Sequence, residues 1–111
     1  MNVCNDKDFH FVYGDVRDYE RLDKYVQKAD VIIPLAAIVG FPACEKDKQL
    51  ATDVNFIHIK NIVDNSSKQQ LILYPNSNSG YGIGEKDNYC TEESQLKPIS
   101  LYGKTKVLTC F

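Results

Sequence analysis

The sequence predicts an α/β protein built on a parallel β-sheet, because apolar runs of strand length alternate with stretches of helical periodicity. The expected strands are at residues 9–13, 31–35 and 71–74, and the expected helices are at about 19–29, 47–65 and 99–111. Strands that alternate with helices form βαβ units, in which the strands are parallel and the crossovers right-handed. The expected order is βαβαβα.

The first strand and helix are predicted from local patterns. Residues 9–13 (Phe-His-Phe-Val-Tyr) are aromatic or β-branched, with His10 among them, and Gly14 ends the run, which is typical of a short strand. Asp18 is a favourable N-cap residue for the helix that follows. This helix carries an apolar stripe at helical spacing, made of Tyr19, Leu22, Tyr25, Val26 and Ala29.

The runs at 31–35 and 71–74 are apolar throughout, and a continuous apolar run predicts a strand buried on both faces of a parallel sheet. Residues 36–46 contain Gly40 and Pro42 and are expected to form a loop. The helix at 47–65 is expected to be buried through a stripe made of Leu50, Val54, Ile57 and either Asn61 or Ile62.

Composition and charge limit the possible partners. The net charge of −2 lacks the clustered Lys and Arg that nucleic acids and membrane surfaces select, so neither partner is expected. The four cysteines are widely spaced, which predicts reduced thiols and no metal site. No basic and apolar leader begins the sequence, and no apolar run is long enough to span a bilayer. We expect a cytoplasmic protein.

Three side chains point to acid/base chemistry. Tyr102 and Lys106 are four residues apart and share one helix face, so the ammonium group can approach the phenol and stabilise a phenolate. Ser77 lies upstream in a polar loop that follows the third expected strand. Such a trio suggests proton-coupled redox chemistry on an alcohol or a carbonyl group.

Several short motifs follow one another in the order of a known family. They are Gly14-Asp15-Val16-Arg17-Asp18, Leu35-Ala36-Ala37, Asn55, Ser77 with Tyr81-Gly82, and Tyr102 with Lys106. Together they resemble the extended short-chain dehydrogenase/reductases, the NAD-dependent epimerase/dehydratase group that acts mostly on nucleotide sugars. The resemblance extends from about Phe9 onward. It implies a partial Rossmann-like parallel sheet that corresponds to family strands 3 to 5.

The resemblance implies a role for each matching residue. Ser77, Tyr102 and Lys106 are the expected catalytic residues. NAD is the expected cofactor, with NADP not excluded, and its expected contacts are Asp15, Val16, Leu35, Ala36, Ala37, Tyr102 and Lys106. A nucleotide-sugar substrate is expected to contact Asn76, Ser77 and Asn78. The sequence leaves two interpretations open for Asp15, which either flanks the adenine or simply follows a strand, and for Asn55, which either supports the site or is an ordinary helix residue.

The sequence also departs from the family. It contains no Gly-x-x-Gly-x-x-Gly loop for the pyrophosphate, and the run at 80–84 is expected to be a loop that needs positive φ. Because the family strand order is 3-2-1-4-5, two strands are missing between the first and second expected strands. We therefore expect residues 1–111 to be an incomplete central part of a Rossmann-type domain, a fragment that is inactive alone. The alternative is a non-catalytic interaction module that pairs with a full-length relative through its helices. A homodimer through the helices at 47–65 and 99–111 is a further expected partner, implied by the resemblance.

Overall fold

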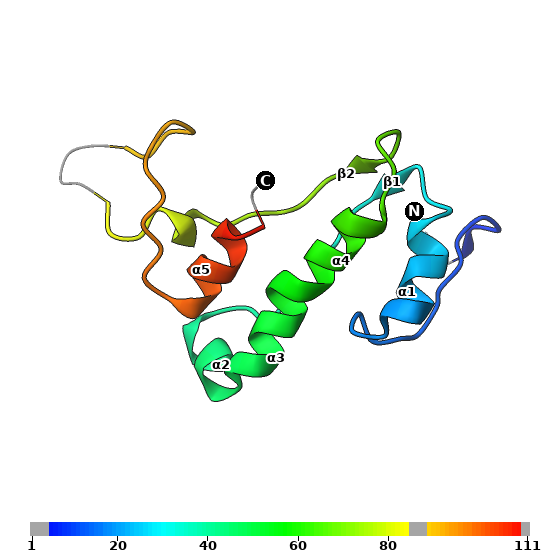
Figure 1. The fold of residues 1–111 in the computed structure, drawn as a ribbon, viewed down its shortest axis with the longest axis horizontal. Helices are drawn as coiled ribbons and strands as arrows, with labels where there is room; N and C mark the ends of the chain where they lie inside the picture. Colours follow the sequence, from blue (N-terminus) through cyan, green and yellow to red (C-terminus); the bar gives the residue numbers. More distant parts are fainter. Residues whose placement is uncertain (1–4, 85–88, 110–111) are drawn as a thin grey trace.

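The structure is a computed structural model of the 111-residue chain and describes residues 5–84 and 89–109. Its elements, shown in Figure 1, are α1 (Tyr19–Val26), β1 (Val31–Ile32), α2 (Phe41–Lys46), α3 (Lys48–Thr52), η2 (Asp53–Ile57), α4 (His58–Asn65), β2 (Leu71–Ile72), η3 (Asn78–Gly80) and α5 (Leu101–Val107). No helix in these ranges is long and apolar enough to cross a membrane.

The two strands β1 and β2 are parallel, as predicted, and α2 to α4 form the crossover between them. Val31 pairs with Leu71 and Ile32 with Ile72, and the Leu73 N–H donates to the Ile32 carbonyl at 2.9 Å. The ladder is shorter than the predicted strands, and Pro34, which has no N–H group, follows it closely. The architecture is a partial α/β Rossmann fold, which confirms the predicted class.

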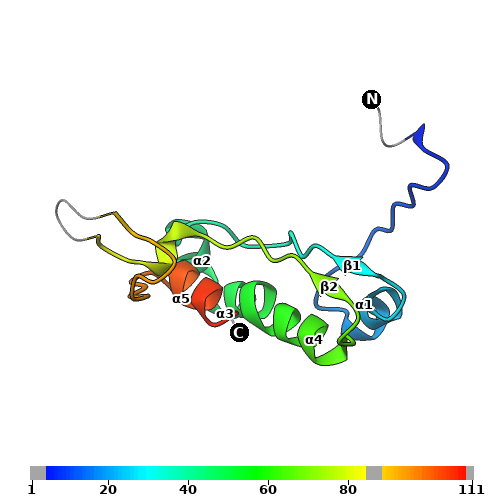
Figure 2. The same cartoon turned by 90° about the horizontal axis from the view of Figure 1, so that it is seen from above.

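The predicted strand at 9–13 is not formed. Neither described strand pairs with this segment, which leads away from the body of the molecule in Figure 2. Phe11 and Tyr13 are 77% and 84% exposed. A strand needs a neighbour for its backbone hydrogen bonds, and here β1 and β2 pair only with each other. The residues have strand propensity without a partner strand.

The sheet is covered on one face only, so the prediction of strands buried on both faces is wrong. The helices lie on one side of β1 and β2 in Figure 2. Ile32 is half-buried and Pro34 is buried. The other face carries exposed apolar side chains from both strands and the residues after them: Val31, Ile33, Leu35, Leu71 and Leu73.

The predicted loop at 36–46 contains the short helix α2, which is a further correction. Gly40, at φ 87°, turns the chain into the helix, and a proline lies in its first turn, where a missing N–H group costs nothing. The fully buried Cys44 anchors the helix to the core. The sequence pattern of glycine and proline therefore marked the start of a helix as well as a turn.

The long helix predicted at 47–65 is present as α3, η2 and α4 in succession, and Asp47 caps it by accepting from the Leu50 N–H at 2.9 Å. Leu50 and Ile57, predicted to be buried, are only half-buried. The π-helical turn η2 adds a residue to one turn and rotates the buried face. The buried side chains are Ala51, Val54, Asn55, His58, Ile59 and Ile62.

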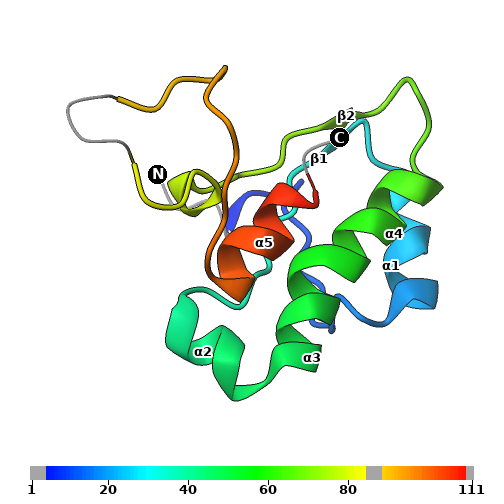
Figure 3. The ribbon, with the colours of Figure 1, turned by 60° about the vertical axis from the view of Figure 1, so that its left-hand side comes forward.

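Helix α5 begins at Leu101, and the Ser100 hydroxyl caps it by accepting from the Gly103 N–H at 3.0 Å. The helix was expected from about residue 99 to the end, and residues 110 and 111 lie outside the described ranges. Contacts join α5 to α2, η2 and η3, whereas α1 contacts α4. Figures 1 and 3 accordingly show α4 between α1 and α5.

Candidate functional site

Helix α5 brings Lys106 to the segment that follows β2. The Lys106 side chain is buried at 5% exposure, and its Nζ donates to the Pro75 carbonyl at 3.0 Å. The same Nζ lies 4.3 Å from the centre of the Tyr74 ring. Tyr74 and Pro75 thus hold the ammonium group, and Pro75 precedes Ser77 by two residues.

Ser77 lies in a compact polar turn at the start of η3. Its Oγ accepts from the Ser79 N–H at 3.2 Å and lies 3.1 Å from the Ser79 Oγ. The Asn76 Oδ1 accepts from the Ser77 N–H at 2.7 Å. These predicted substrate contacts gather around one hollow of about 300 Å³, lined by Asn76, Ser77, Asn78, Gly80, Tyr81, Leu96 and Val107.

Tyr102 lies in the first turn of α5 and is half-buried. The next residue, Gly103, lets this turn approach η3 closely. A Cβ atom at Gly103 would lie only 2.6 Å from the Ser79 carbonyl oxygen. The absence of a side chain at one position therefore sets how close the Tyr102 turn comes to the Ser77 turn.

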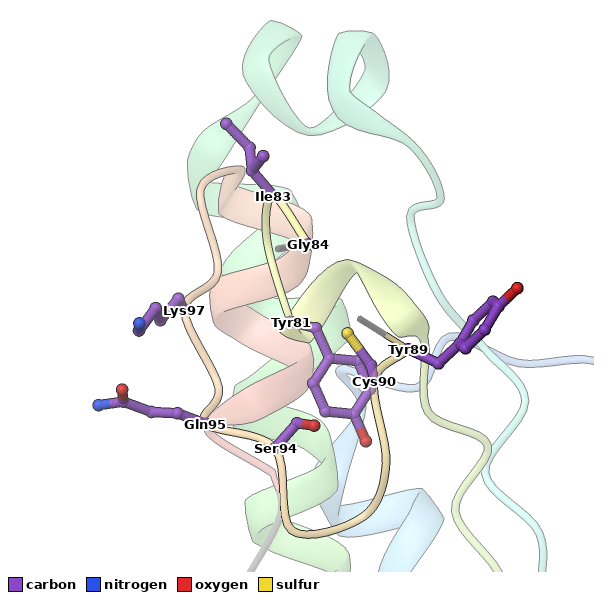
Figure 4. A pocket seen from close by; sticks show the side chains of 8 residues that line it. All are labelled: Tyr81, Ile83, Gly84, Tyr89, Cys90, Ser94, Gln95 and Lys97. Carbon is purple, nitrogen blue, oxygen red and sulfur yellow. The ribbon is translucent and has the colours of Figure 1, made fainter. Parts of the chain in front are cut away.

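A second hollow, of about 250 Å³, adjoins the first and shares Tyr81 with it. In Figure 4 the side chains of Tyr81, Cys90 and Ser94 gather at its centre, whereas Lys97 points away. Gly82 has φ 74°, which confirms the predicted need for positive φ in this loop. The Lys97 N–H donates to the Gly80 carbonyl at 2.9 Å and holds the return of the loop.

A buried histidine lies close to Lys106. His58, on α4, is 1% exposed, and burial lowers its pKa, with a further lowering from the positive charge of Lys106. Among the described residues, the His58 Nδ1 and the Tyr74 hydroxyl are the buried side-chain polar atoms without a hydrogen-bond partner. His58 was expected to be a packing or surface residue, and the structure places it in the core.

The predicted cofactor contacts at the end of β1 lie on an open backbone segment. Leu35 and Ala36 are exposed, and Ala37 is half-buried. The next residue, Ile38, is held by the buried Asn55, whose Oδ1 accepts from the Ile38 N–H at 2.8 Å and whose Nδ2 donates to its carbonyl at 2.9 Å. Asn55 therefore supports the segment that carries the two alanines.

Cys44 makes a further contact with the same backbone group. Its Sγ donates to the Ile38 carbonyl at 3.3 Å, and burial raises the pKa of the thiol, so it keeps its proton at neutral pH. Sequence spacing gave no signal for this contact, because Cys44 had been placed in a loop. The cysteine and the asparagine together fix the loop after β1.

Asp15 and Val16 lie apart from Ser77, beside α1, which Figure 1 shows across α4 from α5. They line a hollow of about 620 Å³ whose other side chains include Val12, Leu22 and Tyr25. The Asp15 carboxylate forms two hydrogen bonds with the Arg17 guanidinium group, at 2.7 and 3.0 Å. Hydrogen bonds from Arg17 lower the pKa of Asp15 to about 2.

The chain matches a known protein family over almost its whole length. The family model described as "NAD dependent epimerase/dehydratase family" matches residues 1–109. A UDP-glucuronic acid 4-epimerase from Bacillus cereus, solved with UDP-glucuronic acid and NAD, is similar to the chain at 27% identity and a TM-score of 0.80. The match covers 96% of this chain and 34% of the epimerase.

Two other proteins extend the comparison. A dTDP-glucose 4,6-dehydratase from Streptomyces venezuelae, solved as a double mutant with NAD bound, has the same fold. It matches at 24% identity and a TM-score of 0.84, over 96% of this chain and 34% of its own. An uncharacterized membrane protein from Methanocaldococcus jannaschii is 26% identical over 86% of this chain and 25% of its own length.

The chain thus spans between about a quarter and a third of the length of these proteins. The family match covers nearly all of its residues. The chain belongs to the NAD-dependent epimerase/dehydratase family.

Proposed function

We propose that residues 1–111 form the central part of an NAD(P)-binding Rossmann-type domain in a nucleotide-sugar epimerase or dehydratase. Ser77, Tyr102 and Lys106 are its acid/base residues. One observation carries this proposal: the Lys106 ammonium group is fixed to the Pro75 carbonyl, two residues before Ser77, at 3.0 Å. This contact supports the proposal that helix α5 and the Ser77 turn belong to one site.

The three side chains divide the chemistry. Tyr102 would give or take the proton of the substrate alcohol, the Lys106 ammonium group would favour the phenolate, and Lys106 is the residue that would hold the ribose of a bound nicotinamide cofactor. Ser77 donates a hydrogen bond to the substrate oxygen. When bound, a nicotinamide cofactor supplies the group that accepts or gives the hydride.

The residues around the open end of β1 fit such a cofactor. Ala36 and Ala37 have small side chains that let a ligand approach the backbone, and Leu35 precedes them on the exposed segment. The hollow beside Asp15 and Val16 has apolar walls that suit a flat adenine ring. We propose NAD as the cofactor, with NADP as an alternative, since NAD-bound relatives share this fold.

The substrate proposal rests on the polar turn. Asn76, Ser77 and Asn78 offer amide and hydroxyl groups to a hollow of about 300 Å³, and such groups recognise a polyhydroxylated sugar by hydrogen bonding. Two similar enzymes are a UDP-glucuronic acid 4-epimerase and a dTDP-glucose 4,6-dehydratase, and both are named for nucleotide sugars. A nucleotide sugar is therefore the substrate class that we propose.

Residues 1–111 alone are expected to bind these ligands weakly and to turn over none, because the sequence has no glycine-rich pyrophosphate loop. Saturation-transfer NMR of the purified chain with NAD and with UDP-glucose tests the sites. We expect transfer to the sugar protons, and its loss in Ser77→Ala with Asn78→Ala. Equal transfer to the sugar of the double variant would contradict the proposed substrate site.

A second candidate is a non-catalytic interaction module that pairs with a full-length relative, or with a second copy of the chain, through the helices at 47–65 and 99–111. Exposed apolar side chains on these helical segments favour it: Val63 at 40% and Leu108 at 53%. Sedimentation velocity of the chain, alone and with the Bacillus cereus epimerase, tests this candidate. Association that Val63→Glu and Leu108→Glu abolish and that Tyr102→Phe leaves unchanged would support it, and a monomer at every concentration would reject it.

A further inference from the structure

The Lys106 ammonium group lies over the aromatic ring of Tyr74, a contact that no sequence motif predicts. Its Nζ lies 4.3 Å from the centre of the Tyr74 ring, well within the range of a cation–π contact. The Lys106 side chain is 5% exposed, so the contact is shielded from water, and shielding strengthens it. A buried cation must be compensated, and the ring is one of the groups that do so.

The hydroxyl group of Tyr74 has no part in this contact. It is buried and has no hydrogen-bond partner among the described residues. A buried hydroxyl without a hydrogen-bond partner is unfavourable for folding. Phenylalanine has no hydroxyl group but offers the same ring face to the ammonium group. The aromatic ring of Tyr74 therefore contacts the ammonium group, whereas its phenol oxygen takes no part in this contact.

The position of Tyr74 in the chain gives the contact its consequence. Tyr74 and Pro75 both contact Lys106, and Ser77 follows Pro75 two residues later on the same short segment. One stretch of backbone thus carries the serine and fixes the lysine that α5 presents beside Tyr102. Tyr74 therefore contacts Lys106 from the same segment that carries Ser77.

We propose that Tyr74 is a positioning residue, whose ring holds the Lys106 ammonium group in register with Ser77 and Tyr102. The importance of this register for catalysis rests on the function proposed above. The contact itself does not, because it is a property of the residues in this chain alone. Phenylalanine at position 74 is expected to preserve the register, and an aliphatic residue of similar volume is expected to lose it.

NMR of the isotopically labelled chain tests the contact without any activity. We expect nuclear Overhauser effects between the Lys106 ε-methylene protons and the Tyr74 ring, and an upfield ring-current shift of those protons. The shift is retained in Tyr74→Phe and lost in Tyr74→Leu. Tyr89→Leu, at a residue that is 94% exposed, is the matched control and leaves it unchanged. Absence of the Overhauser effects in the unsubstituted chain would overturn the proposal, whether or not the leucine variant folds.

The functional half is tested in a reconstituted enzyme, in which the matching segment of the Bacillus cereus epimerase is replaced by residues 5–109 of this chain. We expect Tyr74→Leu to lower kcat by about tenfold or more, with little change in KM for the sugar nucleotide. Tyr74→Phe is expected to keep the kcat of the unsubstituted enzyme. An unchanged kcat in Tyr74→Leu, with the NMR contact present, would overturn the positioning role. Absence of the NMR contact in the unsubstituted chain contradicts this inference alone, whereas a Tyr102→Phe enzyme that stays active contradicts the proposed function.

Discussion

At the scale of single residues, Asn55 shows how a buried amide can organise a loop. Its two ends pair with both backbone polar groups of Ile38, as a strand neighbour would. Replacement by alanine leaves the part-buried N–H and carbonyl of Ile38 without this partner. We expect Asn55→Ala to lower the free energy of unfolding by about 2 kcal/mol or more, measured by urea unfolding.

The control for this substitution is Asn65→Ala. Asn65 is also a helical asparagine whose Nδ2 donates to a backbone carbonyl, at 2.9 Å, but the bond is exposed to water. Its loss is expected to change stability by no more than about 0.5 kcal/mol. Equal effects of the two substitutions would show that the buried amide does not support the loop.

His58 makes the stability of the chain depend on pH. Burial lowers its pKa below the ordinary value of 6.5, with Lys106 adding to the effect. The unfolded chain therefore binds more protons than the folded chain as the pH falls below 6.5, and stability decreases in that direction. We expect urea unfolding at pH 7.5, 6.5 and 5.5 to show this decrease, and His58→Asn to reduce its slope. Identical slopes in the two proteins would contradict the assignment.

At the scale of secondary-structure elements, the close approach of α5 to η3 depends on Gly103. Alanine is a better helix former than glycine by about 1 kcal/mol, but its Cβ would lie 2.6 Å from the Ser79 carbonyl oxygen. The clash is expected to dominate, so that Gly103→Ala destabilises the chain by about 1–3 kcal/mol. The measurement is the urea-unfolding free energy.

Gly84→Ala is the matched control, because nothing lies within 4 Å of a Cβ atom at that position. It is expected to leave stability within about 0.5 kcal/mol of the unsubstituted chain. A stabilised Gly103→Ala variant would mean that α5 and η3 separate at little cost, and the arrangement of Tyr102 and Ser77 described here would then be wrong.

The elements also show which features the sequence can predict. Helical periodicity and capping residues are local, and they predicted α1, the long helix after Asp47 and α5 correctly. The π-helical turn that moves burial from Leu50 and Ile57 to their neighbours has no such local signal. The segment at 9–13 has strand propensity, yet strand formation depends on a partner elsewhere in space.

The candidate site follows the same division. Tyr102 and Lys106 could be placed on one helix face from their spacing, and the family resemblance supplied Ser77. The contact of Lys106 with Tyr74 joins residues that are far apart in the sequence, and neither residue type predicts it. Such contacts arise from how α5 meets the end of β2, which only the three-dimensional structure specifies.

At the scale of the whole molecule, the chain exposes more surface than a compact protein of its size. Its accessible surface is 8518 Å², whereas about 6,200 Å² is typical for this mass. Its radius of gyration is 16.2 Å, against about 13 Å for a compact domain. The open sheet face and the extended segment before α1 both contribute to this large accessible surface. Exposed apolar area of this sort favours association.

This surface predicts that the folded chain binds the dye ANS. Val31→Lys and Leu71→Lys change residues that are paired between β1 and β2 and are 49% and 53% exposed, and they are expected to reduce the fluorescence enhancement clearly. Val39→Lys is the control, since Val39 is exposed at 66% but lies beyond the strands. Equal reductions by all three substitutions would show that the dye does not report the sheet face.

The proposed function depends most on acid/base chemistry by Tyr102 together with Lys106 and Ser77. The most direct measurement is the epimerase rate of the reconstituted enzyme carrying residues 5–109 of this chain, compared with its Tyr102→Phe variant after both are shown to bind NAD. The predicted result is turnover of the sugar nucleotide in the parent and a loss of roughly 100-fold or more in the variant. Comparable rates in the two enzymes would contradict acid/base catalysis by Tyr102.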